Sequence, residues 1–334
     1  SAAPATGWQP LHIVRAGAAA VPLYAKSHSY GEYVFDHGWA SAAHRAGMRY
    51  YPKLLTAVPF TPATGARLLA APDADLHELA NEAFAVAREL GGRIGASSWH
   101  VLFPRDEEVR PWREAGLLHR QGCQYHWFDR GYGDFDGFLA SFRQSRRKTV
   151  KRERRIVADQ GVHVQTLEGT ALEPHHWQVF VECYRATYEK RSGHAGYLNQ
   201  AFFAAIARDM PHNIVMTLAT HGGRYVAAAL CLKSDDTLYG RYWGALDEFS
   251  NLHFEACYYQ GIEYCLAHGL RRFDPGAQGE HKIPRGFEPV LTHSFHWLAE
   301  PRLGAAVADF LEEERRHVRA YADEARELLP FRRD

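Results

Sequence analysis

The sequence predicts an α/β fold made of two similar units, in which mixed β-sheets are flanked by helices. Three observations support this class. The chain has 334 residues, which is long for one domain and usual for two. Segments with the alternating pattern of strands are separated by segments with the 3.6-residue period of helices. A short motif also occurs twice, about two hundred residues apart.

The repeated motif is a strand-like run ending in Lys-Ser, followed by Tyr-Gly-x-Tyr. The first copy is Ala25-Lys26-Ser27 with Tyr30-Gly31-Glu32-Tyr33, and the second is Leu232-Lys233-Ser234 with Tyr239-Gly240-Arg241-Tyr242. An apolar hairpin pattern with a glycine turn precedes each copy. We interpret the repeat as two copies of one fold, the alternative being a chance match between short segments.

The composition limits the classes of function. Lysine plus arginine equals aspartate plus glutamate at 39 each, so binding of phosphates or nucleic acid requires local clustering of charge. Five cysteines are scattered without a Cys-x-x-Cys spacing, which favours reduced thiols and a cytoplasmic location. No apolar run reaches the roughly 18 residues of a membrane span, and no signal-peptide pattern is present. The start, Ser1-Ala2-Ala3-Pro4, resembles a linker or a trimmed end, so we expect natural N-terminal residues to be missing.

The first unit is expected to span residues 1–132. Apolar residues between 76 and 90 recur at spacings of three and four, which predicts a helix ended by Gly91-Gly92. The complete set of elements expected here is a hairpin with an aromatic strand over 8–35, a helix over 39–45, a strand over 50–60, the helix over 76–90, and strands over 99–103 and 125–128.

A basic segment, residues 133–160, separates the two units. Over 135–160 a thin apolar stripe accompanies eight arginines and lysines, which predicts one long basic helix. Arg147 and Lys151 are the candidates to bind the phosphates of a donor substrate. The alternative is a solvated face that balances the acidic residues Glu312-Glu313-Glu314 near the end of the chain.

The second unit is expected to span residues 161–300 and to carry the main site, with a C-terminal helical segment over 301–334. The elements expected are a strand over 162–167, helices over 177–190 and 198–210, a hairpin and aromatic strand up to Tyr242, a helix over 252–268, strands over 272–274 and 291–297, and a helix over 303–328.

Residues 239–287 contain the richest set of polar and aromatic side chains. The stretch runs through a strand, a helix and a second strand into the loop 275–282, which has two glycines and four polar side chains. Such a loop gains little from burying apolar surface, so a ligand or an interface explains its composition better than ordinary solvent exposure does.

Motifs in this stretch resemble the signature of a family of predicted bacterial N-acyltransferases, described as FemAB-like and placed in the GNAT superfamily. They are Leu-Tyr-Gly-Arg-Tyr-Trp-Gly at 238–244, Leu-His-Phe-Glu at 252–255 with Cys-Tyr-Tyr-Gln at 257–260, and Pro-Gly-Ala-Gln-Gly-Glu-His-Lys at 275–282 with Arg285-Gly286. Residues 28–36 and 51–62 also resemble the family, so the resemblance covers nearly the whole chain.

The resemblance implies two tandem GNAT-like domains with a basic helical arm, and a transferase that passes an acyl or aminoacyl group to an amine. The donor would be acyl-CoA or aminoacyl-tRNA. The acceptor would be a small molecule, a peptide or a cell-wall precursor. Fem-type relatives use aminoacyl-tRNA and peptidoglycan precursors, whereas other GNAT enzymes use acyl-CoA.

Attack of a neutral amine on an activated carbonyl needs a proton acceptor near neutrality and donors for the developing oxyanion. His281 is the candidate base, because the pKa of a free histidine lies near neutrality, and Glu255 is the second candidate. Lys282 and Arg285 would hold a carboxylate or a phosphate. The further substrate-binding candidates are Arg241, Tyr242, Trp243, Tyr259, Asp274 and Gln278, together with Tyr30, Glu32 and Asp36 from the first unit.

The sequence departs from the family pattern in two places. The glycine-rich turn with which GNAT enzymes bind the CoA pyrophosphate at a helix N-terminus has no match, which puts an acetyl-CoA site in doubt. Lys282 and Phe287 lie where Fem-type ligases carry Phe-Lys-x-x-Phe, but with a different spacing, so only the lysine carries over.

Two other functions stay open: a non-catalytic module that binds a peptide or peptidoglycan precursor, and an RNA-binding protein that uses the basic helix. A metal site is not expected, although the chain has 20 histidines. His281, His293 and His296 form the best cluster, but the odd spacing of the last two would place them on opposite faces of a strand. No zinc-binding motif supports them, and the sequence does not indicate an oligomeric state.

Overall fold

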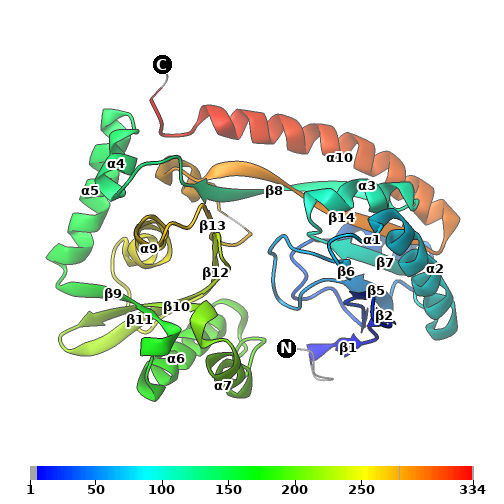
Figure 1. Cartoon of the computed structure of the whole chain (residues 1–334), viewed down its shortest axis with the longest axis horizontal. Helices are drawn as coiled ribbons and strands as arrows, with labels where there is room; N and C mark the ends of the chain where they lie inside the picture. The colour runs from blue at the N-terminus through cyan, green and yellow to red at the C-terminus, as the bar shows by residue number, and fades with distance from the viewer. Residues whose placement is uncertain (1–5, 278, 333–334) are drawn as a thin grey trace. The chain divides into compact units, whose positions relative to one another are not determined.

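The computed structural model describes residues 6–277 and 279–332, which form two compact units. Unit 1 comprises residues 1–124 and 290–323, and unit 2 comprises residues 125–289 and 324–334. The predicted mixed α/β class is confirmed, because the main strands of the described residues form an 11-stranded sheet with parallel and antiparallel neighbours, flanked by helices (Figure 1). Each unit contributes its own strands to this sheet.

In unit 1 the main sheet has the strand order β1-β4-β5-β7-β14. Only the β5–β7 pair is parallel, and the other neighbouring pairs are antiparallel. The bounds are β1 Trp8–Pro10, β4 Tyr24–Lys26, β5 Lys53–Thr56, β7 Ser98–Leu102 and β14 Glu288–Leu298. The predicted N-terminal hairpin is present, but it belongs to a separate small sheet of β2 Ile13–Arg15, β3 Ala19–Val21 and β6 Leu69–Ala70.

In unit 2 the strand order is β8-β13-β12-β11-β10-β9, and only the β12–β13 pair is parallel. The bounds are β8 Leu118–Phe128, β9 Val162–Glu168, β10 Ile214–His221, β11 Arg224–Lys233, β12 Thr237–Ala245 and β13 Arg272–Asp274.

The strands of the two units share one pairing pattern, in which two antiparallel pairs are followed by a parallel and an antiparallel pair, and unit 2 has one further antiparallel pair, β9–β10. The duplication inferred from the sequence is therefore visible in the topology, but the motif placed its third strand wrongly. Tyr30 to Tyr33 form a turn, with Gly31 and Tyr33 at φ 79° and 62°, a left-handed backbone that a strand cannot contain. The strand of unit 1 that takes the place of β12 is β5.

The bounds of the units differ from the four ranges expected from the sequence. The reason is that two long strands cross the boundary: β8 starts in unit 1 and ends in unit 2, and β14 runs from unit 2 into unit 1. Each sheet is thus completed by a strand from the other half of the sequence. The basic segment belongs to unit 2, and most of the C-terminal helix α10, Pro301–Glu327, belongs to unit 1.

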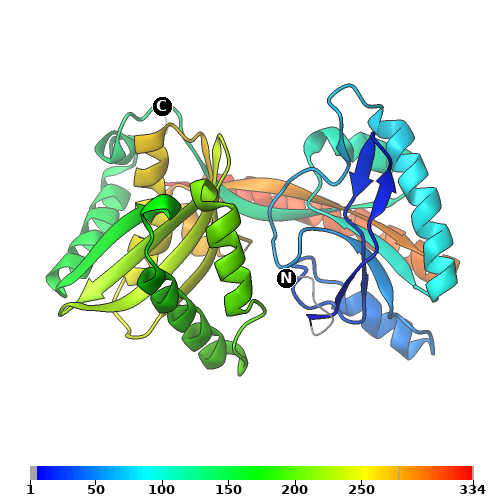
Figure 2. The same ribbon diagram turned by 60° about the horizontal axis from the view of Figure 1, so that its bottom comes forward.

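The sheet of unit 1 is covered on both faces. Helix α2, Leu76–Ile94, packs its alanine-rich side on Leu54, Trp99 and Phe295, while the opposite core contains residues of α1, His37–Arg45, and of α10. Arg15 of the small hairpin forms exposed ion pairs with α2, and Figure 2 shows this hairpin in blue beside that cyan helix. Helix α3, Asp106–Glu114, which the sequence did not predict, packs against α2.

The sheet of unit 2 also lies between helices. Helices α6, Pro174–Ser192, and α7, Gln200–Asp209, lie on one side, and α9, Gln260–His268, lies on the other (Figure 1). The sheet approaches α6 so closely that a Cβ on Gly244 would lie 2.0 Å from the carbonyl oxygen of Cys183. On the other side, Gly261 lets the Phe273 ring lie against α9.

Two predicted helices have different ends. Gly91 and Gly92 lie inside α2, which ends at Gly95 in a left-handed conformation, a conformation that glycine adopts without steric cost. The basic segment is two helices, α4 Phe135–Ala140 and α5 Gln144–Asp159, rather than one. The chain turns between them because Phe142 is buried and the N–H of Arg143 donates to the carbonyl of Pro330.

Candidate active site

The candidate active site starts where β12 and β13 separate. The parallel pairing joins Thr237, Leu238 and Tyr239 of β12 to Arg272, Phe273 and Asp274 of β13, and then β13 ends. Strand β12 continues to Ala245, paired only with β11 among the strands that the structure describes. One edge of residues 240–245 is therefore without a partner among the described strands.

Glycines shape the place where the two strands diverge. A Cβ on Gly240 would lie 3.1 Å from Cα of Pro275, so the chain after β13 crosses close to β12 only because residue 240 has no side chain. Asp274 is buried, and its Oδ1 accepts a hydrogen bond from the N–H of Gly276 at 2.9 Å. This predicted residue therefore fixes the start of the loop that carries the next two candidates.

Lys282 is buried in the short 3₁₀ helix Glu280–Arg285, with 2% of its surface exposed. Its Nζ donates to the carbonyl of Gly276 at 2.6 Å. Burial lowers the pKa of Lys282 to about 8, against the opposing effect of the Asp274 carboxylate. The ammonium therefore predominates at pH 7 and is lost as the pH rises through about 8. Of its three protons, one is donated to Gly276, and no acceptor for the other two lies among the described residues.

His281, the neighbouring candidate, is exposed and belongs to an aromatic cluster. Its Nε2 lies 2.7 Å from the hydroxyl of Tyr258, and its ring centre lies 6.1 Å from that of His253. Partial burial, together with the charges of Lys282 and Arg285, lowers the pKa of His281 below its ordinary value. The imidazole is therefore neutral near pH 7, the state that can accept a proton. We define the aromatic cluster as Trp243, His253, Phe254, Tyr258 and His281.

Three predicted residues of this region take part in ion-pair networks with α5. Arg285 donates from Nη2 to Glu153 at 2.7 Å and from Nε to the hydroxyl of Tyr259 at 3.0 Å, and Tyr259 donates in turn to Glu153. Glu255 is buried and paired with Arg154 at 2.8 Å. These contacts hold α5 to the helix that begins at Leu252, so both Arg285 and Glu255 already have protein partners.

Sequence reasoning missed Glu153 and Arg154, although Glu153 is the only acidic residue between 143 and 155. A single acid in a basic run is a signal of an inward-facing ion pair. Their partners Glu255 and Tyr259 lie in a π-helical turn, Glu255–Tyr259, between α8, Leu252–Phe254, and α9. Such turns occur frequently at functional sites because they change the direction of side chains within a helix.

The remaining candidates of β12 divide between the two faces of the sheet. Tyr242 packs edge-on against Tyr184 of α6, with the guanidinium of Arg241 5.3 Å from its ring centre. Trp243 lies 5.6 Å from His253, in the aromatic cluster. Alternation along the strand thus brings Trp243, and not Tyr242, to His253 and the aromatic cluster. Gln278 lies outside the described residues.

Two of the three candidates of unit 1, Glu32 and Asp36, contact a buried lysine that the sequence did not single out. Lys53 is fully buried, and its Nζ lies 2.7 Å from Oε2 of Glu32 and also contacts Asp36. Burial raises the pKa of Glu32 to about 7, with Asp36 adding to this effect and Lys53 opposing it. Burial would also raise the pKa of Asp36, but the charges of Lys53 and His100 hold it well below its usual range. Tyr30 is exposed instead.

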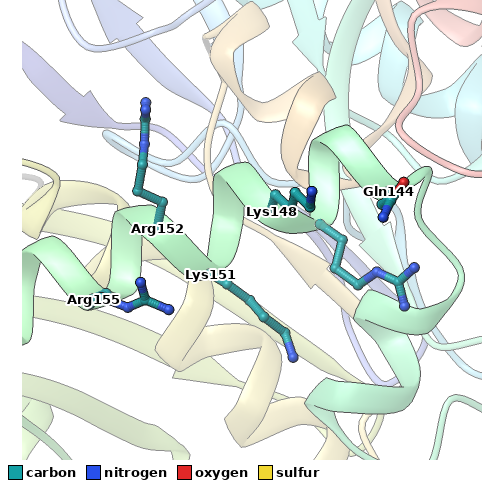
Figure 3. A pocket seen from close by; sticks show the side chains of 6 residues that line it. Gln144, Lys148, Lys151, Arg152 and Arg155 are labelled. Carbon is teal, nitrogen blue, oxygen red and sulfur yellow. The ribbon is translucent and has the colours of Figure 1, made fainter.

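The exposed face of α5 carries the phosphate-binding candidates. Arg147, Lys148, Lys151, Arg152 and Arg155 line a surface hollow of about 500 Å³ with Gln144. Figure 3 shows the labelled side chains of Lys148, Lys151, Arg152 and Arg155 projecting from the helix. Lys151 pairs with exposed Asp136 at 3.1 Å, and no acidic partner is recorded for the other four cations among the described residues. Arg154 points inward, so α5 combines an anchoring face with a basic face.

The histidines do not form the cluster considered in the sequence. His293 lies 2.9 Å from His119, whereas His296 lies 2.7 Å from His100, so the two residues face opposite sides of β14 as expected from their spacing. His281 belongs to unit 2, whereas His293 and His296 belong to unit 1. Within residues 6–277 and 279–332, no group of three or more His, Cys, Asp or Glu side chains is placed to hold a metal ion.

The fold and site define a two-unit protein with a mixed α/β sheet flanked by helices. The chain belongs to the FemAB-like family, described as peptidoglycan biosynthesis/recognition, whose model matches residues 1–333. The resemblance noted in the sequence is thereby confirmed. A comparison with curated proteins finds no match.

Solved structures show the same fold at low sequence identity. FemX is 13% identical, with a TM-score of 0.53 over 91% of this chain and 92% of FemX. L-PGS from Bacillus licheniformis is 8% identical, with a TM-score of 0.56 over 91% and 89% of the two chains. A domain from Agrobacterium fabrum, designated a lysylphosphatidylglycerol synthetase C-terminal domain, is 11% identical, with a TM-score of 0.58 over 91% and 88%. None of the helices in the described parts of the chain has the length and apolar character needed to cross a membrane.

Proposed function

We propose that the protein is an N-acyl- or aminoacyltransferase that acts on an amine of a peptide or cell-wall precursor. The observation that carries this proposal is the arrangement at the open edge of β12, where buried Lys282 and the neutral imidazole of His281 follow the end of β13. Membership of a family described by peptidoglycan biosynthesis/recognition supports the class of acceptor.

In the proposed reaction the amine nitrogen attacks the carbonyl carbon of the donor ester or thioester. His281 takes a proton from the attacking amine, and Lys282 donates hydrogen bonds to the oxyanion that forms. The bond from the carbonyl carbon to the donor's oxygen or sulfur then breaks. The leaving group takes the proton that His281 removed from the amine, and it departs as an alcohol or a thiol. Trp243 and Tyr258 hold the His281 side of the site in place through ring contacts and a hydrogen bond.

The donor is proposed to be aminoacyl-tRNA or acyl-CoA, with its phosphates bound by Arg147 and Lys151 on α5. Support comes from the basic face of this helix, where Lys151 has the exposed Asp136 as a partner and the other four cations have no acidic partner among the described residues, although the whole chain has equal numbers of acidic and basic residues. The same face would serve an RNA-binding protein without catalysis, so turnover has to be measured separately from binding.

Replacing His281 with alanine is expected to lower the turnover of amine and donor by about 10²–10⁴-fold, the usual contribution of a general base. Donor binding should change less than about threefold, because no binding contact is assigned to this ring. The measurement is transfer of a radiolabelled group from a pool of aminoacyl-tRNAs, and from a panel of acyl-CoAs, to amine-bearing peptides. His212→Ala, at an exposed site in the 3₁₀ helix Pro211–Asn213, is the matched control. Binding with no turnover of any donor by the unchanged protein would support the non-catalytic binding module instead.

Charge reversal on α5, Arg147→Glu with Lys151→Glu, is expected to weaken tRNA binding by at least about tenfold at low salt. The affinity of the unchanged protein should fall steeply with salt, and the double variant should show a shallower slope because it releases fewer counterions. Filter binding across a salt series measures both effects. Arg110→Glu, on the exposed side of α3, is the control. An unchanged slope in the double variant would remove α5 from the donor site.

A further inference from the structure

A second hollow lies entirely within unit 1, outside the residues assigned to transfer. It has a volume of about 700 Å³ and is formed by α1 and the segment that follows it. The residues that matter for its chemistry are His37, His44, Arg45, Arg49, Tyr50 and Tyr51. We refer to it as the α1 hollow.

The walls of the α1 hollow are basic. Arg45 and Arg49 are exposed, no acidic side chain lines the hollow, and neither arginine has an ion pair or hydrogen bond with a residue in the described parts of the chain. Arg45 lies in the last turn of α1, where a cation also complements the helix dipole. Arg49 lies beyond the last turn of α1, and the effect of the helix dipole is confined to that turn. The dipole therefore does not account for a positive charge at Arg49.

The floor of the hollow is formed by two tyrosines whose hydroxyl groups are hydrogen bonded to neighbouring side chains. The hydroxyl of Tyr50 donates to Oδ2 of Asp36 at 2.7 Å, and the hydroxyl of Tyr51 lies 2.8 Å from Oγ of Ser29. The two rings meet at 90° with their centres 5.2 Å apart. Behind them lies the buried ammonium of Lys53, 5.8 and 5.9 Å from the two ring centres. This ammonium compensates the charge of Asp36, and the other carboxyl group that contacts it, Glu32, has its pKa raised to about 7 by burial.

We propose that the α1 hollow binds an anionic group, a phosphate or a carboxylate, carried by a ligand with an apolar or planar body. Two unpaired guanidinium groups offer paired donors in the geometry that carboxylates and phosphates accept. The aromatic floor offers an apolar surface to the rest of the ligand. This proposal concerns binding in unit 1 and does not depend on the transferase activity proposed for unit 2.

The test is a titration of the unchanged protein with inorganic pyrophosphate and, separately, with succinate, followed by calorimetry and by backbone amide NMR shifts. We expect binding of at least one anion with shifts at residues 37–51. The double variant Arg45→Gln/Arg49→Gln should bind that anion at least about tenfold more weakly. Preference for pyrophosphate would identify a phosphate ligand, and preference for succinate a carboxylate ligand.

Two controls separate this site from other basic surfaces. Arg147→Gln/Lys151→Gln on α5 should leave the shifts at residues 37–51 unchanged. Arg93→Gln, an exposed arginine of α2, should leave the affinity unchanged. The proposal is overturned if neither anion binds at about 10 mM, an affinity too weak for a specific site. It is also overturned if the Arg45→Gln/Arg49→Gln variant, with an unchanged melting temperature, binds as tightly as the original protein.

Discussion

Replacing Lys282 with methionine is expected to lower kcat by at least about 100-fold, the usual loss when one donor to a developing oxyanion is removed. Methionine fills a similar volume, so the buried position keeps most of its packing while the charge disappears. The measurement is the transfer rate at saturating donor and acceptor. KM should change much less than kcat, because the contact strengthens only as the oxyanion forms.

The pH profile distinguishes Lys282 from a structural residue. The pKa of Lys282 is lowered to about 8 by burial, so its ammonium is lost as pH rises through 8, and kcat/KM should fall there. The pKa of His281 is lowered below its ordinary value, so on the acidic side the rate should rise as this ring loses its proton. The expected profile is a bell with its alkaline limb near pH 8.

Lys282→Arg is the informative companion, because arginine keeps its charge over the whole range of the assay. Its residual activity should have no alkaline limb near pH 8, and neither should that of Lys282→Met. An alkaline limb that stays in place in both variants would assign it to another group. A rate that rises through pH 8 in the unchanged protein would show that the neutral amine is the active form, contrary to the role proposed for the ammonium.

Replacing Lys53 with methionine is expected to destabilise the protein by about 3–5 kcal/mol, because it leaves buried carboxylates without their counter-charge. Lys53 has no exposed surface, and it contacts Glu32, Asp36 and Ser29 together. Urea unfolding followed by tryptophan fluorescence measures the loss. Lys233→Met is the matched control, because the Lys233–Glu168 pair is partly exposed and such pairs contribute only about 0–1 kcal/mol.

The loss of folding stability in Lys53→Met should increase with pH. Without the ammonium, burial raises the pKa values of Glu32 and Asp36 in the folded protein above those in the unfolded chain. A carboxyl group whose pKa is raised by folding destabilises the folded protein increasingly as the pH rises from its unfolded-state pKa to its folded-state pKa. At a pH below both pKa values the group is protonated in both states, and it no longer affects stability. The destabilisation should therefore be larger at pH 8 than at pH 5. Adding Glu32→Gln and Asp36→Asn should recover part of the stability, and a loss independent of pH would contradict this account.

Most of the secondary structure could be predicted from local patterns. The apolar periodicity of α2 and α6 and the three residues of β13 were sufficient to find these elements. The local patterns gave the wrong helix ends where contacts with a distant segment of the chain determine them. Gly91 stays helical because it packs against Leu54, and the basic segment breaks at Phe142 because that ring is buried and the next residue is hydrogen bonded to Pro330. Spacing along the sequence contains no information about such partners.

In the candidate site, too, the local sequence predicted some features, and others depend on contacts with distant residues. The sequence selected the loop that carries His281 and Lys282, because polar side chains among glycines and prolines are unusual without a ligand. It could not tell that Arg285 and Glu255 are paired with α5, since Glu153 and Arg154 lie about 100 residues or more away. It also missed Lys53, because a lysine in a strand pattern is normally assigned to solvent.

The sequence by itself determined the class of fold, the duplication, the family and the loop that bears the two main candidates. These properties follow from local periodicity and from contiguous motifs. The tertiary structure alone decided which strands are equivalent in the two units, because β8 and β14 each complete a sheet formed mainly by the other half of the chain. It also decided which charges are free to meet a ligand, because pairing and burial depend on residues that only folding brings together.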